Sequence, residues 1–187
     1  MLYKILQKVC SLVALIATIQ PAVARQHLHG SSITVSTPVY GNLYITAGRV
    51  SVNAPVHGDL IIAGGYVDIN DSVYNDVMLA AGEATFRGFI GGDLRCAGGR
   101  VRVSRDVAGD ILVAGGDVVI DSNIVVGNVT GSGGTITING TVKGDLSAAA
   151  EHFILNGRVE GITHCKAKEI VVNGTLEKGG TLAASGI

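Results

Sequence analysis

The sequence predicts an all-β fold in one domain: a single-stranded β-helix, or solenoid, of seventeen-residue coils. A repeat carries this prediction, and its apolar first positions are Val39, Val56, Val73, Ile90, Val107, Val125, Val142, Val159 and Leu176. Seven of the eight spacings are 17 residues and one is 18, which gives eight full copies and a truncated ninth. A fixed short period is typical of a solenoid, in which each repeat packs only against its neighbours.

Alternation inside each copy supports the same fold. Numbering the copy from 1 to 17, positions 5 and 7 are apolar between polar or small neighbours, as at Leu60 and Ile62. Positions 12 and 14 repeat the pattern, as at Val67 and Ile69. Period-two alternation predicts short half-buried strands, and no stretch after residue 30 shows the helical period. We therefore expect positions 1, 5, 7, 12 and 14 to form inward columns.

Three turns are expected in each coil. Glycine occupies position 10 in six consecutive copies, at Gly48, Gly65, Gly82, Gly99, Gly116 and Gly134. A glycine at a fixed corner supplies a positive φ or a close backbone approach. Gly-Asp at positions 3 and 4 predicts a second corner, and the Asn/Asp/Gly cluster at positions 15 and 16 predicts a third. Eight coils stacked ~4.8 Å apart would form a rod of roughly 40 Å.

Residues 1–24 predict a secretory signal peptide. Lys4 and Lys8 give a basic start, an apolar run of eleven residues spans 9–19, and residues 22–24 read Ala-Val-Ala. Eleven apolar residues are too few to span a hydrocarbon core of ~30 Å, and the small residues fit a cleavage site. The expected location is therefore the periplasm or the cell surface, with an uncleaved N-terminal anchor as the alternative.

The rest of the chain divides simply. Residues 25–38 are polar, and they are expected to form a flexible lead-in and a partial first coil, with Ile33 and Val35 alternating. Residues 39–187 form the β-helix, with the extra residue near 124–126 expected as a bulge or a wider corner. The net charge of −1 is too balanced to indicate a nucleic-acid partner.

The most regular polar feature is a column at position 4: Asn42, Asp59, Asp76, Asp93, Asp110, Asn128 and Asp145. Stacked carboxylates repel each other, so each needs a compensating partner. One interpretation is that every side chain accepts a hydrogen bond from a turn N–H beside its glycine. The other is a row of divalent cations such as Ca²⁺. The first interpretation is adopted, and no metal site or cofactor is predicted.

Cys96 and Cys165 both fall at inward position 7, four coils apart. A separation of roughly 19 Å exceeds the ~7 Å Cα limit for a disulfide, so both are expected to be free and buried. His164 precedes Cys165, but alternation turns the two side chains to opposite faces. No catalytic residues are predicted, and an enzyme is not expected because every coil has the minimal length.

Three outward features are candidate contact surfaces. Four tyrosines (Tyr40, Tyr44, Tyr66 and Tyr74) could stack on a glycan. Five arginines (Arg87, Arg95, Arg100, Arg102 and Arg105) ring the fourth coil and its approach, either as a solvated belt or as a site for anionic glycans or lipid headgroups. Position 6 carries an apolar stripe, interrupted by Arg95, that could form side-by-side contacts.

The repeat Val-x-Gly-Asp-Leu followed by Ala-Gly-Gly-x-Val-x-Ile is similar to that of the bactofilins, a polymer-forming bacterial family. The resemblance covers residues 39–175 and is closest to the exported branch. It implies a right-handed triangular β-helix that polymerises end to end without nucleotide and acts as a scaffold in the cell envelope. Glu151 and Lys168 depart from the pattern at the corner glycine, and Ile162 departs at the aspartate.

The leading functional expectation is a non-enzymatic structural scaffold of the bacterial cell envelope that self-associates through its coil ends. Terminal coils present unpaired N–H and C=O groups, and no amphipathic cap is recognisable after Val172. Ile33 and Val35 would lie near one end, and Leu176 and Leu182 near the other. The alternative is an exported adhesin or glycan-binding rod. The expected partner is a second copy, and peptidoglycan or another envelope glycan is the further candidate.

Overall fold

The computed structural model describes residues 26–121 and 123–185, so the expected signal peptide lies outside the described residues. Nine ten-residue strands and one shorter strand form the main sheet: β1 (Gln26–Val35), β2 (Leu43–Val52), β3 (Leu60–Ile69), β4 (Val77–Phe86), β5 (Leu94–Val103), β6 (Ile111–Ile120), β8 (Val129–Ile138), β10 (Leu146–Leu155), β12 (Thr163–Val172) and β14 (Gly180–Ala184). A four-stranded sheet holds β7 (Ile124–Val125), β9 (Thr141–Val142), β11 (Arg158–Val159) and β13 (Thr175–Leu176).

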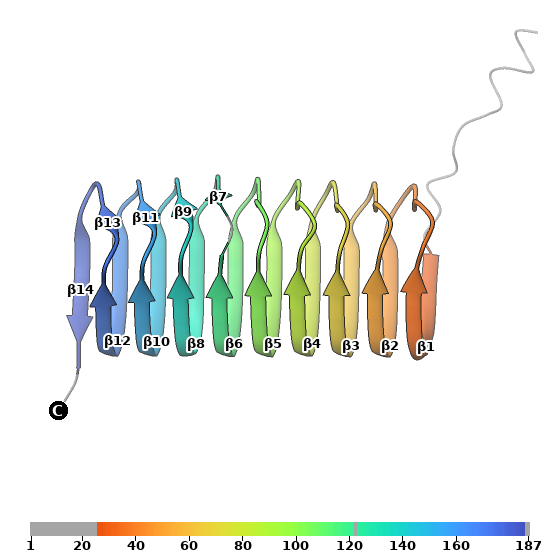
Figure 1. The fold of residues 1–187 in the computed structure, drawn as a ribbon, viewed down its shortest axis with the longest axis horizontal. Helices are drawn as coiled ribbons and strands as arrows, with labels where there is room; N and C mark the ends of the chain where they lie inside the picture. The colour runs from red at the N-terminus through yellow and green to blue at the C-terminus, as the bar shows by residue number, and fades with distance from the viewer. Residues whose placement is uncertain (1–25, 122, 186–187) are drawn as a thin grey trace, which may run out of the picture.

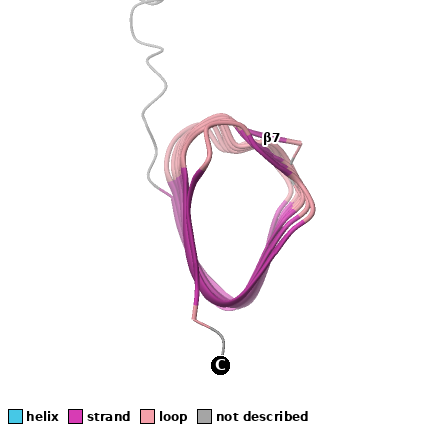
Figure 2. Ribbon diagram, turned by 90° about the vertical axis from the view of Figure 1, so that its left-hand side faces the viewer, coloured by secondary structure: helices cyan, strands magenta, loops and turns pink. Residues whose placement is uncertain are grey.

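All strand pairs are parallel, and each residue pairs with its equivalent in the next coil. Leu60, for example, pairs with Val77, and Ile69 pairs with Phe86. The coils line up along one axis, with β1 at one end of the rod and β14 at the other (Figure 1). Seen from the β14 end, the chain descends along one leg, turns at a rounded vertex and rises along a second leg (Figure 2). Because successive coils approach the viewer as the path runs counterclockwise, the helix is right-handed.

The inward columns are confirmed. Position 1 is buried from Val39 to Val159, and position 5 is buried from Leu43 to Thr163. Position 7 is buried from Ile45 to Cys165, position 12 from Val50 to Phe153 and position 14 from Val35 to Leu155. Together these columns form one continuous core. Side-chain volumes compensate each other across the core. A Cβ at Gly131 in column 7 would lie 3.2 Å from Cδ1 of Ile136 in column 12, so the isoleucine fills the place that the glycine leaves.

The corner at position 10 differs from the sequence prediction in one respect. Each coil has a single strand over positions 5–14, not two short strands, and its paired register skips only position 10. Among the described residues, positive φ occurs only at Gly41, Gly179 and Gly180. Glycine is therefore needed at position 10 because the backbone of the preceding coil lies too close for a Cβ atom. A Cβ at Gly99 would lie 2.9 Å from the carbonyl oxygen of Gly82.

Two further segments differ from expectation or refine it. The strand of the first coil reaches back to Gln26 in register with Leu43, so these residues are not a flexible lead-in. Pairing to β2 orders this polar stretch, although its own alternation covers only Ile33 and Val35. The expected bulge or wider corner includes residue 122, which lies outside the described residues, and β7, which follows it, pairs with β9 within the stack. From that coil onward, position 1 belongs to the second sheet.

Candidate functional site

The column at position 4 is a ladder of side-chain acceptors. Oδ1 of Asp93 accepts a 2.9 Å hydrogen bond from the backbone N–H of Asp110, and Asp110 does the same for Asn128 at 2.7 Å. The equivalent bonds run from Asp59 N to Asn42, Asp93 N to Asp76, Asp145 N to Asn128 and Ile162 N to Asp145. The interpretation of these side chains as turn acceptors is therefore correct.

Glycine at position 3 makes room for this ladder. A Cβ at Gly109 would lie 2.3 Å from Oδ1 of Asp93, and a Cβ at Gly92 would lie 2.2 Å from Oδ1 of Asp76. Side chains cannot approach that closely, so the Gly-Asp pair is one structural unit. Asn75 is the exception at position 3 among the ladder coils. In this coil, among the described residues, the backbone N–H of Asp76 donates no hydrogen bond to the Asp59 carboxylate.

Neighbouring groups compensate the column's charge. Nη2 of Arg95 lies 2.7 Å from Oδ2 of Asp93, and its Nη1 lies 3.7 Å from Oδ2 of Asp76. At the other end, Nδ2 of Asn42 donates to Oδ2 of Asp59 at 2.9 Å. Among residues 26–121 and 123–185 there is no group of three or more His, Cys, Asp or Glu that could hold a metal ion. The hydrogen bonds of the column join neighbouring coils.

A second polar ladder follows the third corner. Nδ2 of Asn156 donates to Oδ1 of Asn139 at 2.8 Å, and Asn173 donates to Asn156 at 2.9 Å. On the N-terminal side, Nδ2 of Asn70 donates to Oδ1 of Asn53 at 2.8 Å. These amides link consecutive coils outside the core, in the way that stacked asparagines do in other repetitive β structures.

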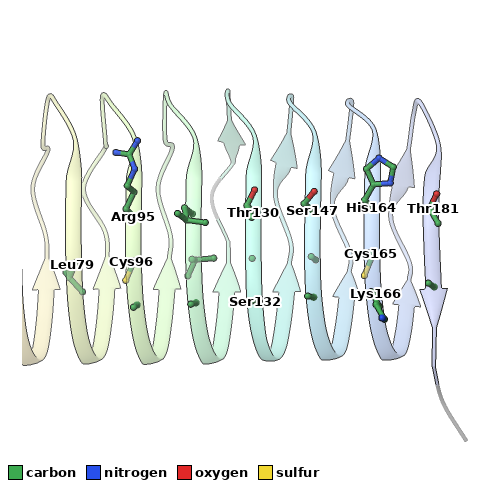
Figure 3. Close-up of a pocket in the computed structure, with 18 of the residues that line it drawn as sticks. Leu79, Arg95, Cys96, Thr130, Ser132, Ser147, His164, Cys165, Lys166 and Thr181 are labelled. Atoms are coloured by element: carbon green, nitrogen blue, oxygen red, sulfur yellow. The ribbon is translucent and has the colours of Figure 1, made fainter.

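Cys96 and Cys165, the two cysteines among the described residues, are free and buried, as predicted. Burial raises the pKa of Cys96 to about 12 and that of Cys165 to about 11. A thiolate is the nucleophilic form, so these cysteines are chemically quiet in the folded protein. His164 is exposed while Cys165 points inward, which separates their side chains (Figure 3). The geometry offers no nucleophile and base pair at this place.

The arginine belt is largely paired with acidic residues. Arg87 bonds Asp68 at 2.8 Å, Arg100 bonds Glu83 at 2.7 Å, and Arg102 pairs with Asp121. Arg95 belongs to the aspartate column, and only Arg105 lacks an ion pair with another described residue. The belt is therefore a network of mixed charge, which does not favour an anionic ligand.

The tyrosines point outward, and two sets of aromatic rings stack along the rod. His57 lies between Tyr40 and Tyr74, with ring centroids 4.7 and 4.8 Å apart and planes within 11°. His27 stacks on Tyr44 in the same way at 4.7 Å. Each stack places residues of one position in consecutive coils at the strand spacing. The stacked rings are seventeen residues apart in the sequence, so the repeat could have predicted the stacking, although the sequence prediction treated the tyrosines as separate.

A shallow apolar groove of about 800 Å³ runs along the outward face of the first legs. Met78 and Leu112 are half-exposed at one end of it, whereas His164 and Lys166 lie at the other. Small residues such as Thr130 and Ser147 line the middle in a row, one from each strand (Figure 3). Of the apolar stripe that the sequence predicts at position 6 (Tyr44, Ile61, Met78 and Leu112), only Met78 and Leu112 line this groove. It contains no group of acid, base and nucleophile.

Both ends of the rod leave the core incompletely covered. Leu28 and Ile33 are only partly buried at the β1 end. At the other end Val172 and Leu182 are 39% and 41% exposed, whereas Leu155, one coil below Val172, is fully buried. In the described ranges no helix is long and apolar enough to cross a membrane. Within the described ranges, the coil ends are therefore the places where partly exposed apolar side chains and unpaired strand edges coincide.

Comparisons with models of protein families, with curated proteins and with solved structures found no match to this chain.

Proposed function

We propose that this protein is a structural scaffold of the cell envelope whose rods self-associate through their coil ends. The observation that carries the proposal is the uncovered second leg of β12. Val172 is 39% exposed there, and no strand follows its edge in the described structure. An open edge of this kind is a template for another chain. The resemblance of the repeat to the bactofilins supports the same function.

The site chemistry favours a scaffold over an enzyme. The polar columns are occupied by hydrogen bonds between coils, and the thiols are buried. A glycan-binding rod is the second candidate, because Tyr40, Tyr66 and Tyr74 are at least half-exposed. Their stacking along the rod and the pairing of the arginines make this candidate weaker.

Sedimentation velocity and electron microscopy of the mature chain, residues 25–187, test the proposal. We expect filaments that form without nucleotide and survive moderate salt, because main-chain pairing does not depend on screened charges. Val172→Pro removes an edge N–H and should leave monomeric folded rods. The matched control is Arg100→Glu with Arg102→Glu, far from both ends, which should still assemble. A clean monomer at high protein concentration would overturn the proposal.

A further inference from the structure

The last strand covers only half of the coil beneath it. β14 pairs with Thr163–Ala167, the first leg of β12, whereas β10 pairs with both legs of β12. The C=O of Leu155 accepts a hydrogen bond from Asn173 in the next coil, but Val172, at the same position, has no such partner among the described residues. Ile170 and Val172 are accordingly more exposed than the residues one coil below them. Among the described residues, which end at 185, no strand covers the second leg of β12.

β14 is also weakly held on the leg that it covers. All five of its residues are exposed, including Leu182, which is 41% exposed although Cys165 beneath it is buried. Gly179 and Gly180 enter the strand with φ values of 72° and 149°, which other residues rarely adopt. A Cβ at Gly180 would lie 1.8 Å from the carbonyl oxygen of Thr163. The strand therefore depends on two glycines at its base.

Thr163 lies in the core directly beneath the first residue of β14. Column 5 is leucine, isoleucine or valine in all seven coils from Leu43 to Leu146, and then becomes threonine. Thr163 is fully buried, and its Oγ1 has no hydrogen-bond partner. Gly180, its neighbour in β14, has no side chain to supply one. An unpaired buried hydroxyl is destabilising, so β14 leaves a specific polar group unsatisfied.

The opposite end of the rod fits this place in register. Gly179 is at position 4, and the β1 strand begins at Gln26, which is at position 5. If β14 is withdrawn, Gln26 of a second copy is therefore the next residue along the helical path. Its carboxamide would lie above Thr163 and could both donate to and accept from the hydroxyl.

The rest of β1 continues the columns of β12. In the nine-residue register that β1 forms with β2, Leu28 of the second copy would cover Cys165, Ile33 would cover Ile170, and Val35 would cover Val172. At position 1, Val39 of the second copy would follow Leu176 as Val56 follows Val39. The outward neighbours, His27 over His164 and His29 over Lys166, add no opposite charges. Specificity would therefore come from the inward columns.

Simple stacking on an intact β14 does not achieve this fit. With β14 in place, the β1 strand of a second copy would lie one coil further out. Its second leg would then be separated from Glu169–Val172 by the missing coil, a gap of ~4.8 Å beyond normal strand spacing. Ile170 and Val172 would stay uncovered and Thr163 would stay unpaired.

We infer that β14 is a placeholder that the β1 strand of a second copy displaces when rods join head to tail. The exchange replaces a pairing of five residues with one of nine and covers the open leg of β12. This inference rests on the proposed self-association and identifies its partner surface. It also assigns β14 an inhibitory role, because the strand must leave before the junction forms.

The first test weakens β14 in the otherwise complete protein. Gly180→Val introduces the clash with Thr163, and Leu182→Lys places a charge over column 7. Both variants, and a chain that ends at Gly179, should assemble at a protein concentration at least threefold lower than the wild type, measured by light scattering. Thr181→Val, on the exposed side of the same strand, is the matched control and should assemble like the wild type.

The second test determines which residues of β1 in one copy and of β12 in the other lie side by side where two rods join. Thr34 and Val171 share outward position 13, so the exchange places them on neighbouring strands. Thr34→Cys with Val171→Cys should give intermolecular disulfides on mild oxidation. Thr34→Cys with Ile154→Cys is the control, because Ile154 lies one coil deeper and about 9.6 Å from the new strand, beyond the ~7 Å Cα limit.

The outcomes separate the exchange from the broader proposal. If the wild type assembles but the chain ending at Gly179 does not, β14 is part of the interface, so the exchange is wrong and self-association stands. If the Val171 pair cross-links no better than the Ile154 pair, the register is wrong. If the wild type and the truncated chain are both monomeric at every concentration, the proposed function itself falls. Earlier assembly of the truncated chain together with selective cross-linking supports the exchange.

Discussion

The backbone N–H of Asp110 donates a 2.9 Å hydrogen bond to Oδ1 of Asp93, one coil earlier. Gly109 makes this contact possible, because a Cβ at its place would lie 2.3 Å from that oxygen. The Gly-Asp motif is therefore a device that joins neighbouring coils. The acceptor is a carbonyl-type oxygen, which explains why Asn42 and Asn128 can take the place of aspartate.

The ladder predicts a difference between two changes at Asp93. Asp93→Ala removes the acceptor of the Asp110 N–H and should lower the free energy of unfolding by about 1 kcal/mol, whereas Asp93→Asn keeps the acceptor and should cost less. Urea denaturation monitored by circular dichroism measures the free energy of unfolding of both variants. Asp59→Ala is the matched control with a smaller expected loss, because it removes only the side-chain bond from Asn42 Nδ2 and no backbone N–H of Asp76 depends on Asp59. Equal losses for Asp93→Ala and Asp93→Asn would contradict the ladder.

Much of this architecture could be predicted from the repeat alone. Inward positions 5 and 7 are odd while positions 12 and 14 are even, and this change of phase predicts the corner between the two legs. The sequence could not show that the strand continues through that corner. Pairing through the bend depends on the backbone geometry of adjacent coils. The alternation of residues within a single coil contains no information about that geometry. The free thiols Cys96 and Cys165 followed from the period and from the reach of a disulfide.

The two ends were the least predictable part. Apart from Leu28, Gln26 to Ser32 are polar or glycine and lack a continuous strand pattern, so their pairing comes from β2 and not from their own sequence. At the other end, β14 is a strand although every residue in it is exposed. Composition alone does not show that Gly180 approaches Thr163 or that the Thr163 hydroxyl is left unpaired. These contacts require the structure.

The buried thiols predict a decline of stability at alkaline pH. In the unfolded chain a cysteine ionises near pH 9.0, but burial raises the pKa of Cys96 to about 12. Between these values the folded state binds more protons than the unfolded state, so stability falls as pH rises. The expected slope is about 1.4 kcal/mol per pH unit for each thiol. Cys96→Ala should unfold with a shallower dependence between pH 9 and 11 than the wild type.

A thiol reagent gives a direct check on the same burial. At pH 8 the native chain of residues 25–187, which lacks Cys10, should not react with Ellman's reagent, and after denaturation Cys96 and Cys165 should both react. Fast reaction of the native protein would show that the core opens easily at these coils. A bridged pair would give no reaction even in denaturant without reductant.

The N-terminal residues predict cleavage during export. Ala22-Val23-Ala24 should direct a signal peptidase to cut after Ala24, so that the mature chain begins at Arg25. Intact-mass measurement of the protein recovered from the envelope fraction would detect the cut. Retention of Met1 to Ala24 in that fraction would favour an anchor. Ala24→Tyr should block cleavage, because a large side chain does not fit the small-residue requirement.

The apolar groove predicts contacts between rods that lie side by side. Met78 and Leu112 are each about half-exposed on this face. Met78→Lys with Leu112→Lys should leave single filaments intact but reduce their bundling in electron micrographs, because exposed apolar area drives lateral association. Tyr66→Lys, an exposed change on the other leg, is the control. Unchanged bundles in the double variant would remove the groove from the assembly.

The stacked rings predict that the tyrosines contribute to stability and not to glycan binding. Tyr40 and Tyr74 each turn one face toward His57, so a sugar cannot use those faces as it would use an open aromatic platform. Tyr40→Ala with Tyr74→Ala should lower the free energy of unfolding by about 1 kcal/mol for each lost stack. Cosedimentation with purified peptidoglycan should be the same for the variant and for the wild type. A tenfold loss of cosedimentation with assembly unchanged would instead favour the glycan-binding rod, because only that function needs the rings themselves.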